Sequence, residues 1–499
     1  MFDRRHFLRI STLAASAGAA KSVAGTPTST SAAPSPARLG DGAPGRIIHM
    51  VADGTSLGTW SCGDQLARLE TGRGLAWFEL WRRPEAYTCL MDMRSLDSLV
   101  TDSAAASSSW GSGSRVRNGV LNVSSTGKPL IPLMALFGEA GWRRGLVTTT
   151  EITHATPAGF TVAVDSRGEG ETIAKKYLER KLDVFLGGAR DHFDPTKRKD
   201  KRDLWIQFAA AGYYVAKTKA EFEKAPDDRP WLGTFTSGHL PYSIDQARDK
   251  NLQATVPTLR EMTDRALAHL ERHDHFLLQI EGGRVDHACH NNDAAGALRD
   301  LLAFDEALVR VLEFRRQHPD TLVVVTTDHG NANLGLNGIG TSYRDSSHSF
   351  RHVARVRASF PEILKRLKAA PSESEAKEIL AESTGYKVSS RKLAQFLPFL
   401  SGRGTTLFDQ MNSDVAALGQ LLANHLGIGF VGTTHTSDYV PVAAIGPGAD
   451  RFRGLIRNVD VFRIFTDLAR IDYRNPEERL LADTPANPRA ENHAAYAVA

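Results

Sequence analysis

The sequence lacks the features that mark several classes of protein. It has three cysteines in 499 residues, too few for a disulfide framework, and they lack the paired spacing of a zinc knuckle. No apolar run reaches the roughly 18 residues that a membrane-spanning helix needs. The net charge is only +4, so no basic surface of the kind that binds nucleic acid is expected. With 41% hydrophobic and 24% charged residues, the composition excludes disordered, collagen-like and polytopic membrane proteins.

The N-terminus predicts export. Residues 1–24 start with a basic segment around Arg4 and Arg5, continue into a weakly apolar stretch and end with small residues up to Ala24. This order is typical of a twin-arginine signal followed by a signal-peptidase site. Such a signal directs export and does not anchor the protein in a membrane. A disordered basic tail is the alternative. Residues 25–44 have the composition of a flexible linker. We therefore expect a soluble periplasmic or extracellular protein.

Apolar runs that end in acidic residues predict the fold and the place of a site. The runs alternate with helical segments such as 293–314, which predicts an α/β fold with a mostly parallel central sheet flanked by helices. Ligands bind such sheets at the carboxyl ends of the strands, where the sequence has Asp53, Glu281 and Asp328. One such acid is a common turn residue, but three of them predict a site. The runs that we expect as strands are 46–51, 146–150, 183–186, 276–280, 322–327 and 440–445.

Residues 355–427 interrupt this alternation with amphipathic helical segments. We interpret them as a helical insertion or cap within a catalytic domain that spans residues 45–475. The insertion could cover the site, set the size of the substrate or form a subunit contact. Residues 476–499 are polar and are expected to form a tail.

Histidines next to two of the strand ends predict a metal centre. Asp286 and His290 are four residues apart, so a helix places them on one face, where they can hold zinc with a further histidine. His435, in a loop before a strand, is a natural third ligand. Asp328 and His329 lie side by side at another strand end. Each residue alone has a structural explanation, but mixed Asp/His sets are typical of zinc, and paired metals can clamp the oxygens of a displacement reaction.

Ser103 is the candidate nucleophile. It follows Asp102 at the expected start of an Ala-rich helix, where free N–H groups and the helix dipole favour a phosphate group. The same position favours a metal-bound alkoxide. An ordinary helix cap is the alternative explanation. A metal centre nearby, to which Asp53 and Glu281 could add a third cation, favours the catalytic interpretation.

In chain order, these motifs resemble the alkaline phosphatase family. The motifs are Asp53-Gly54, Asp102-Ser103, the segment 150–158, Glu281 to His287, Asp328-His329 and His435. Six separated motifs make the resemblance specific, and it covers about residues 45–470 apart from the insertion. It implies the fold of this family and the hydrolysis of phosphate monoesters.

The resemblance implies a role for each site residue. The first zinc ion would be held by Asp286, His290 and His435, the second by Asp53, Asp328 and His329, and a magnesium ion by Asp53, Thr156 and Glu281. Ser103 would attack phosphorus and form a phosphoserine. Arg167 would bind two phosphate oxygens, with Asp102 orienting it, and a surface arginine is the alternative. Because the metal ligands must be deprotonated, acid should weaken activity.

Two histidines stand where other family members have an acid and a lysine. We expect His154 to act on magnesium-bound water and not as a direct ligand, and His287 to contact phosphate through water. These differences leave the metal of the third site and the pH optimum open. Cys289 is expected to pack in the core, and His348 and His352 receive no role.

Three other functions are alternatives. A sulfatase needs a formylglycine motif, but Ser103 is followed by alanines. A phosphodiesterase of the same superfamily needs space that Glu281, Thr156 and Arg167 would fill. A catalytically inactive zinc-binding protein would lack a ligand or the nucleophile, and none is missing. The resemblance therefore favours small phosphate monoesters as substrates, with no nucleic acid as a specific partner and a homodimer as one option for the assembly.

Overall fold

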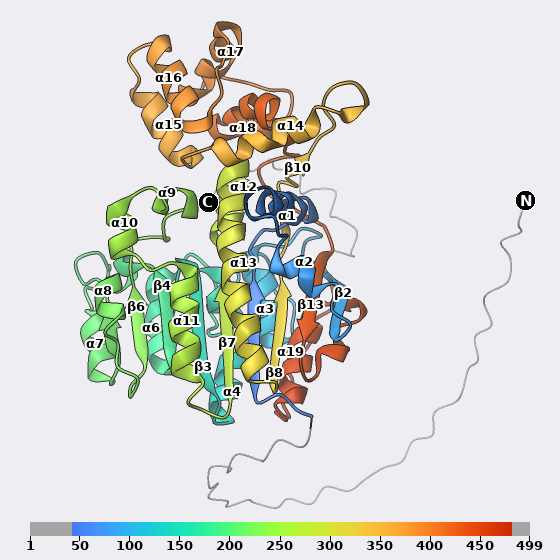
Figure 1. Cartoon of the computed structure of the whole chain (residues 1–499). Helices are drawn as coiled ribbons and strands as arrows, with labels where there is room; N and C mark the ends of the chain where they lie inside the picture. Colours follow the sequence, from blue (N-terminus) through green and yellow to red (C-terminus); the bar gives the residue numbers. More distant parts are fainter. Residues whose placement is uncertain (1–41, 482–499) are drawn as a thin grey trace, which may run out of the picture. The chain divides into compact units, whose positions relative to one another are not determined.

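A ten-stranded sheet organises residues 42–481, the part of the chain that the computed structural model describes (Figure 1). Its strands are β1 (Arg46–Val51), β2 (Ala86–Asp92), β3 (Arg143–Glu151), β4 (Val184–Gly188), β5 (Tyr214–Ala216), β6 (Trp231–Thr234), β7 (Phe276–Glu281), β8 (Thr321–Thr326), β13 (Val440–Ile445) and β14 (Gly454–Arg457). The order across the sheet is β14-β2-β13-β8-β1-β7-β3-β4-β6-β5. Only the pairs of β13 with β2 and β8 are antiparallel. The expected fold class, α/β with a mostly parallel sheet, is confirmed.

The central strands are buried on both faces. In β1, Ile48 and Met50 face one core, whereas Ile47 and Val51 face the other. The first core is covered by α1 (Leu57–Thr71), α11 (Leu259–Leu270) and α13 (Ala294–Gln317), and the second by α3 (Ser103–Ser112), α6 (Gly170–Arg180) and α19 (Asn458–Leu468). A parallel sheet between two helical layers explains why its strands are apolar runs without alternation.

The six runs expected as strands all form strands of this sheet: two have the expected bounds, and the ends of the other four shift by at most three residues. One of them, β13, runs antiparallel to β8, with Ala444 opposite Val324. Its first residue therefore lies at the edge where the parallel strands end. This direction brings His435, which precedes β13, to the edge that carries the acidic residues. The unpredicted strands β14, β2, β6 and β5 lie at the two sides of the sheet, where runs are shorter or partly exposed.

Four helices occupy the segment that the sequence marks as an insertion. They are α15 (Phe360–Ala369), α16 (Glu373–Thr384), α17 (Ser390–Leu400) and α18 (Asp414–Leu426). They pack against one another, and the short helix η3 (Arg351–Arg355) before them contacts α1 and α13. The predicted signal peptide, most of the linker and most of the tail lie outside the described residues, so the domain limits stay a prediction. Within residues 42–481, no helix is long and apolar enough to cross a membrane.

Short elements at the carboxyl edge of the sheet carry the residues of interest. They are α5 (Ala155–Gly159), α9 (Ser243–Gln246), α12 (Arg284–His290), β9 (Gly330–Asn331) and β12 (His435–Thr436). The last two pair with each other, with His435 opposite Asn331. This ladder joins the loop after β8 to the loop before β13.

Candidate active site

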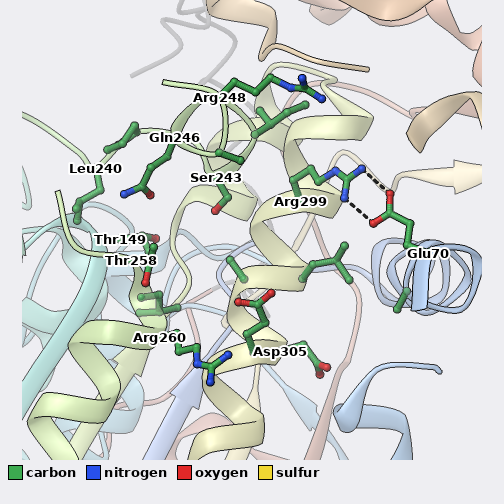
Figure 2. Close-up of a pocket in the computed structure, with 18 of the residues that line it drawn as sticks. Glu70, Thr149, Leu240, Ser243, Gln246, Arg248, Thr258, Arg260, Arg299 and Asp305 are labelled. Atoms are coloured by element: carbon green, nitrogen blue, oxygen red, sulfur yellow. Dashed lines mark hydrogen bonds and ion pairs between the residues drawn. The ribbon is translucent and has the colours of Figure 1, made fainter. Parts of the chain in front are cut away.

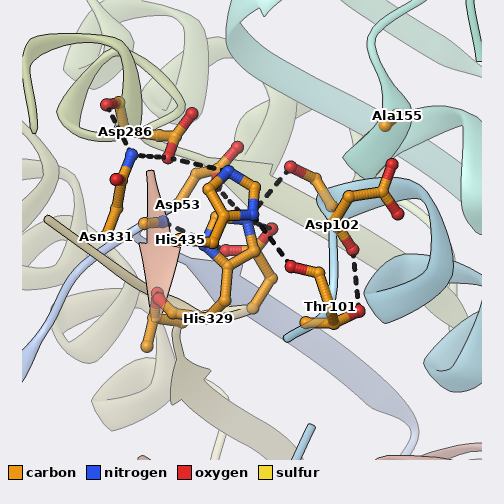
Figure 3. Close-up of polar contacts among 12 residues, drawn as sticks. Asp53, Thr101, Asp102, Ala155, Asp286, His329, Asn331 and His435 are labelled. Atoms are coloured by element: carbon orange, nitrogen blue, oxygen red, sulfur yellow. Dashed lines mark hydrogen bonds and ion pairs between the residues drawn. The ribbon is translucent and has the colours of Figure 1, made fainter. Parts of the chain in front are cut away.

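Three groups of side chains at this edge could each hold a metal ion. In each group, one possible ligand atom per residue lies within 4.8 Å of the others. The groups are Asp286, His290 and His435 (group one), Asp53, Asp328 and His329 (group two), and Asp53, His154 and Glu281 (group three). Figure 3 shows members of groups one and two around the ring of His435. The structure thus brings together the residues that the sequence predicts as two metal sites.

Group one is arranged around two imidazole nitrogens. The Nε2 atoms of His290 and His435 lie 3.1 Å apart, and the His290 Nε2 lies 3.4 Å from a carboxylate oxygen of Asp286. Each ring uses Nδ1 for a backbone carbonyl, that of Thr433 at 2.7 Å and that of Thr101 at 2.8 Å. A carbonyl only accepts, so Nδ1 carries the proton in each neutral ring and Nε2 presents a lone pair. Two lone pairs and a carboxylate that face one another fit a cation.

Group two is fully buried. Asp53 and Asp328 have no exposed area, and His329 is 1% exposed. The His329 Nε2 lies 3.2 Å from Asp328 Oδ2 and 3.6 Å from Asp53 Oδ1. Neither oxygen of Asp53 has a hydrogen-bond donor. Because buried carboxylates without partners are unfavourable, this arrangement also fits a cation.

Burial and neighbouring charges shift the pKa values of Asp53, Asp286 and His435 in different directions. Burial raises the pKa of Asp53 well above its ordinary value, and the carboxylates of Asp328 and its neighbours raise it further. Burial opposes the charge of Asp286 too, but the imidazole of His290, whose own pKa Asp286 raises against the effect of burial, holds the pKa of Asp286 well below its ordinary value. Burial lowers the pKa of His435 to about 3. Asp286 is therefore ionised and His435 neutral, as metal ligands must be.

Group three is centred on Glu281. Its Oε2 accepts hydrogen bonds from the hydroxyls of Thr148 and, at 3.2 Å, Thr150. Its Oε1 has no partner and lies 3.8 Å from the equally unpartnered Nδ1 of His154. Thr156, on α5, is buried, and its hydroxyl also has no partner. The free oxygens fit a magnesium ion, which prefers oxygen ligands.

Ser103 begins α3, as the sequence predicts, and lies beside group two. Its Oγ is 3.2 Å from the His329 Nε2. Asp102 caps the helix by accepting the N–H of Ala105 at 2.8 Å, so the simple explanation of a helix cap holds for Asp102 but not for Ser103. The other oxygen of Asp102 accepts a hydrogen bond from Arg167 at 3.1 Å.

Arg167 also fixes the tautomer of His154. Its Nη2 lies 3.0 Å from the His154 Nε2. A guanidinium only donates, so this Nε2 accepts and the proton of the neutral ring lies on Nδ1. A protonated Nδ1 cannot bind a metal directly, and the role of His154 toward water that the sequence analysis expects stays a prediction.

Sequence reasoning missed Asn331. Its amide donates to Asp286 Oδ1 at 2.6 Å and to the Asp286 carbonyl at 3.1 Å (Figure 3). The available signal was its position two residues after His329. Cys289 is buried in the core, as expected, and His287 lies on α12 with its ring 5.6 Å from that of His154.

A cavity of about 670 Å³ lies beside α9, α11 and α13 (Figure 2). Its lining includes Leu240, Ser243 and Arg299 but no member of the three groups. One lining residue, Thr149, accepts the backbone N–H of Arg284 with its hydroxyl at 3.2 Å. The cavity and the three metal groups are therefore lined by different residues.

Comparisons with known proteins agree with the geometry. The family model described as alkaline phosphatase matches residues 46–471. Alkaline phosphatase 4 of Bacillus subtilis is 31% identical over 370 residues, which cover 72% of this chain and 75% of that protein. Alkaline phosphatase 3 of the same organism is 30% identical over 375 residues, with the same two coverages. The crystal structure of Thermus thermophilus alkaline phosphatase superposes with a TM-score of 0.82 at 35% identity and covers 88% of this chain and 94% of that one.

Proposed function

Since this chain belongs to the alkaline phosphatase family and is a metal-dependent phosphomonoesterase, we propose that it works through a phosphoserine at Ser103 with two zinc ions and one magnesium ion. One observation carries the proposal. The Ser103 hydroxyl lies 3.2 Å from the His329 Nε2, in a group whose buried Asp53 carboxylate has no hydrogen-bond donor. A serine hydroxyl next to an imidazole nitrogen and a buried carboxylate that could hold a cation is the arrangement that metal-assisted phosphoryl transfer needs.

The donor sets support the choice of metals. Groups one and two mix imidazole nitrogen with carboxylate oxygen, which suits zinc. We propose zinc ions there, held by Asp286, His290 and His435 and by Asp53, Asp328 and His329. We propose magnesium between Asp53, Thr156 and Glu281, whose side chains offer oxygen only. When bound, these ions supply positive charge that stabilises the attacking, leaving and phosphoryl oxygens.

The chain's own residues then define two displacements. In the first, the Ser103 Oγ forms a bond to phosphorus as the bond from phosphorus to the alcohol oxygen breaks, and the proton that Ser103 loses is balanced by the one that the departing alkoxide takes up to leave as the alcohol. In the second, water attacks phosphorus, the bond to Oγ breaks, and phosphate leaves with the Ser103 hydroxyl restored. Arg167, held by Asp102, binds two phosphate oxygens in both steps.

His154 and His287 complete the site without binding metal. The His154 Nδ1–H has no acceptor, and Glu281 Oε1 has no donor, although they lie 3.8 Å apart. A water molecule between two such groups satisfies both, which supports a role for His154 toward water at the magnesium site. We propose that His287 contacts phosphate through water.

We propose export by the twin-arginine route to the periplasm or the medium, with residues 1–24 as the signal and 45–475 as the catalytic domain. The sequence motif around Arg4 and Arg5 supports the route. The predicted insertion at 355–427 and a homodimeric assembly belong to the same proposal. Light scattering of the purified protein would test the assembly.

The test is hydrolysis of a chromogenic phosphate monoester by the mature protein, with and without zinc and magnesium. We expect metal-dependent turnover that falls by roughly 10³-fold or more in Ser103→Ala. Ser109→Ala is the matched control, because Ser109 lies in the same helix and its hydroxyl donates to the Ala105 carbonyl, at 2.9 Å, and not to a site residue. Acid-quenched reactions should contain a peptide phosphorylated at Ser103. Cleavage of a diester or a sulfate ester instead of the monoester would contradict the proposal.

A further inference from the structure

We infer that Arg284 is a positioning residue that determines which ring nitrogen of His287 carries the proton. This inference rests on the proposed phosphatase site. Arg284 begins α12, and its Nη1 lies 2.7 Å from the Nδ1 of His287, three residues later. A guanidinium has donors only and stays charged in proteins. The His287 Nδ1 must therefore accept, and the proton of the neutral ring lies on Nε2.

The guanidinium of Arg284 is itself held in place. It lies over the ring of Tyr242, 3.8 Å from the ring centre. Tyr242 is 4% exposed, and its hydroxyl is 3.2 Å from the side-chain amide of Asn291. The backbone N–H of Arg284 is bound by the hydroxyl of Thr149. A stacked, anchored guanidinium cannot turn away from His287, so the tautomer is set by the fold.

In the two neighbouring imidazoles, those of His239 and His154, one ring nitrogen likewise accepts a hydrogen bond from a group that can only donate. The ring of His239 packs against that of His287, with centres 4.3 Å apart, and its Nδ1 accepts the backbone N–H of Glu151 at 3.1 Å. On the other side, His154 accepts from Arg167. Each of the three rings thus has one nitrogen fixed by a group that can only donate. Together they connect Arg284 to the arginine that we propose binds phosphate.

The consequence is that His287 offers the site a neutral N–H donor in one orientation. Arg284 acts through His287 and does not contact the substrate. A donor that contacts phosphate equally before and during the reaction contributes to binding and not to the chemical step. Loss of Arg284 should therefore weaken the binding of substrate and phosphate without lowering kcat.

The tautomer can be measured directly. We would record ¹⁵N spectra of the zinc- and magnesium-loaded protein labelled at histidine, with His287 assigned from the signals lost in His287→Gln. We expect an unprotonated Nδ1 and a protonated Nε2 in the wild type. A protonated Nδ1 would overturn the inference. This measurement does not depend on activity, so it stands even if monoester turnover, and with it the proposed function, fails.

Kinetics tests the consequence. In Arg284→Met we expect KM and the inhibition constant of inorganic phosphate to rise about tenfold, the loss of one hydrogen bond, with kcat not lowered. Arg284→Lys keeps a donor and should recover most of the difference. Arg299→Met is the control, because Arg299 pairs with Glu70. In the His287→Gln background, Arg284→Met should have no further effect, and an undiminished effect there would overturn the inference.

Discussion

The two oxygens of Asp286 have different partners, and this difference depends on Asn331. Oδ1 accepts the Asn331 amide at 2.6 Å, whereas Oδ2 faces His290. We predict that Asn331→Leu lowers zinc affinity about 10- to 100-fold, because the carboxylate then rotates freely. Zinc retained against a competing chelator measures this, with the exposed Asn337→Leu as the control. Unchanged affinity would mean that Asp286 is held by the other ligands alone.

The buried carboxyl group of Asp300 makes the stability of the fold depend on pH. Burial raises the pKa of Asp300, on α13, from 3.8 to about 7, although Arg284 and Ser243 favour its charged form. Between about pH 4 and pH 7 the folded protein keeps a proton that the unfolded chain has lost. The stabilisation from this group is therefore complete below pH 4 and is lost as the pH rises to 7. Relative to the wild type, Asp300→Asn should gain about 1–3 kcal/mol between pH 5 and pH 8 in urea unfolding. A difference that does not change with pH would show that Asp300 is ionised throughout.

At this scale the sequence predicts what depends on local spacing and misses what depends on packing. The pair Asp286 and His290 follows from helical periodicity, and Ser103 from its place at a helix start. Asn331 meets Asp286 across 45 positions of the chain, and Thr148 meets Glu281 across 133. Contacts of this kind exist only once the elements have packed, so a short motif can mark Asn331 by its position near His329 but cannot reveal its partner.

At the scale of elements, α3, which begins with Ser103, packs closely on α5, which carries Thr156. A Cβ at Gly111, on α3, would lie 2.0 Å from the backbone oxygen of Gly159, on α5. We predict that Gly111→Ala separates the helices, lowers the free energy of unfolding by about 1–3 kcal/mol and lowers kcat/KM. Gly335→Ala is the control, because a Cβ there meets nothing within 4 Å. For each variant, urea unfolding measures the free energy of unfolding and monoester kinetics measures kcat/KM. If Gly111→Ala matched the control, the spacing of these helices would not matter.

The elements also show why the fold was only partly predictable. Buried central strands are continuous apolar runs, so β1, β7 and β8 could be located from the sequence. The side strands lack such runs, because β5 and β6 have only three and four residues and no residue of β14 is buried. The direction of β13 was not predictable, since an apolar run does not record whether its neighbour is parallel. Yet this direction is what brings His435 to the site.

At the scale of the whole molecule, the metal groups connect distant parts of the chain at one edge of the sheet. Four carboxylates, those of Asp53, Glu281, Asp286 and Asp328, are at most 4% exposed there. Without cations they repel one another, as the raised pKa of Asp53 shows. The bound ions should therefore stabilise the folded protein as well as the reaction, since a ligand that binds only the folded state adds to its stability.

We predict that chelation lowers Tm by about 5 °C or more and that zinc with magnesium restores it. The loss should grow from pH 5 to pH 8. A group with a raised pKa, such as Asp53 without metal, stabilises the fold below its unfolded pKa and loses that contribution as the pH rises, whereas the loaded protein keeps Asp53 ionised and paired. Ser103→Ala keeps every proposed ligand, so its Tm should fall equally although it is inactive. Calorimetry with metal analysis of each sample measures this. An unchanged Tm after verified removal of the metals would mean that the ions serve the reaction only and that the sheet edge tolerates its four carboxylates by binding protons.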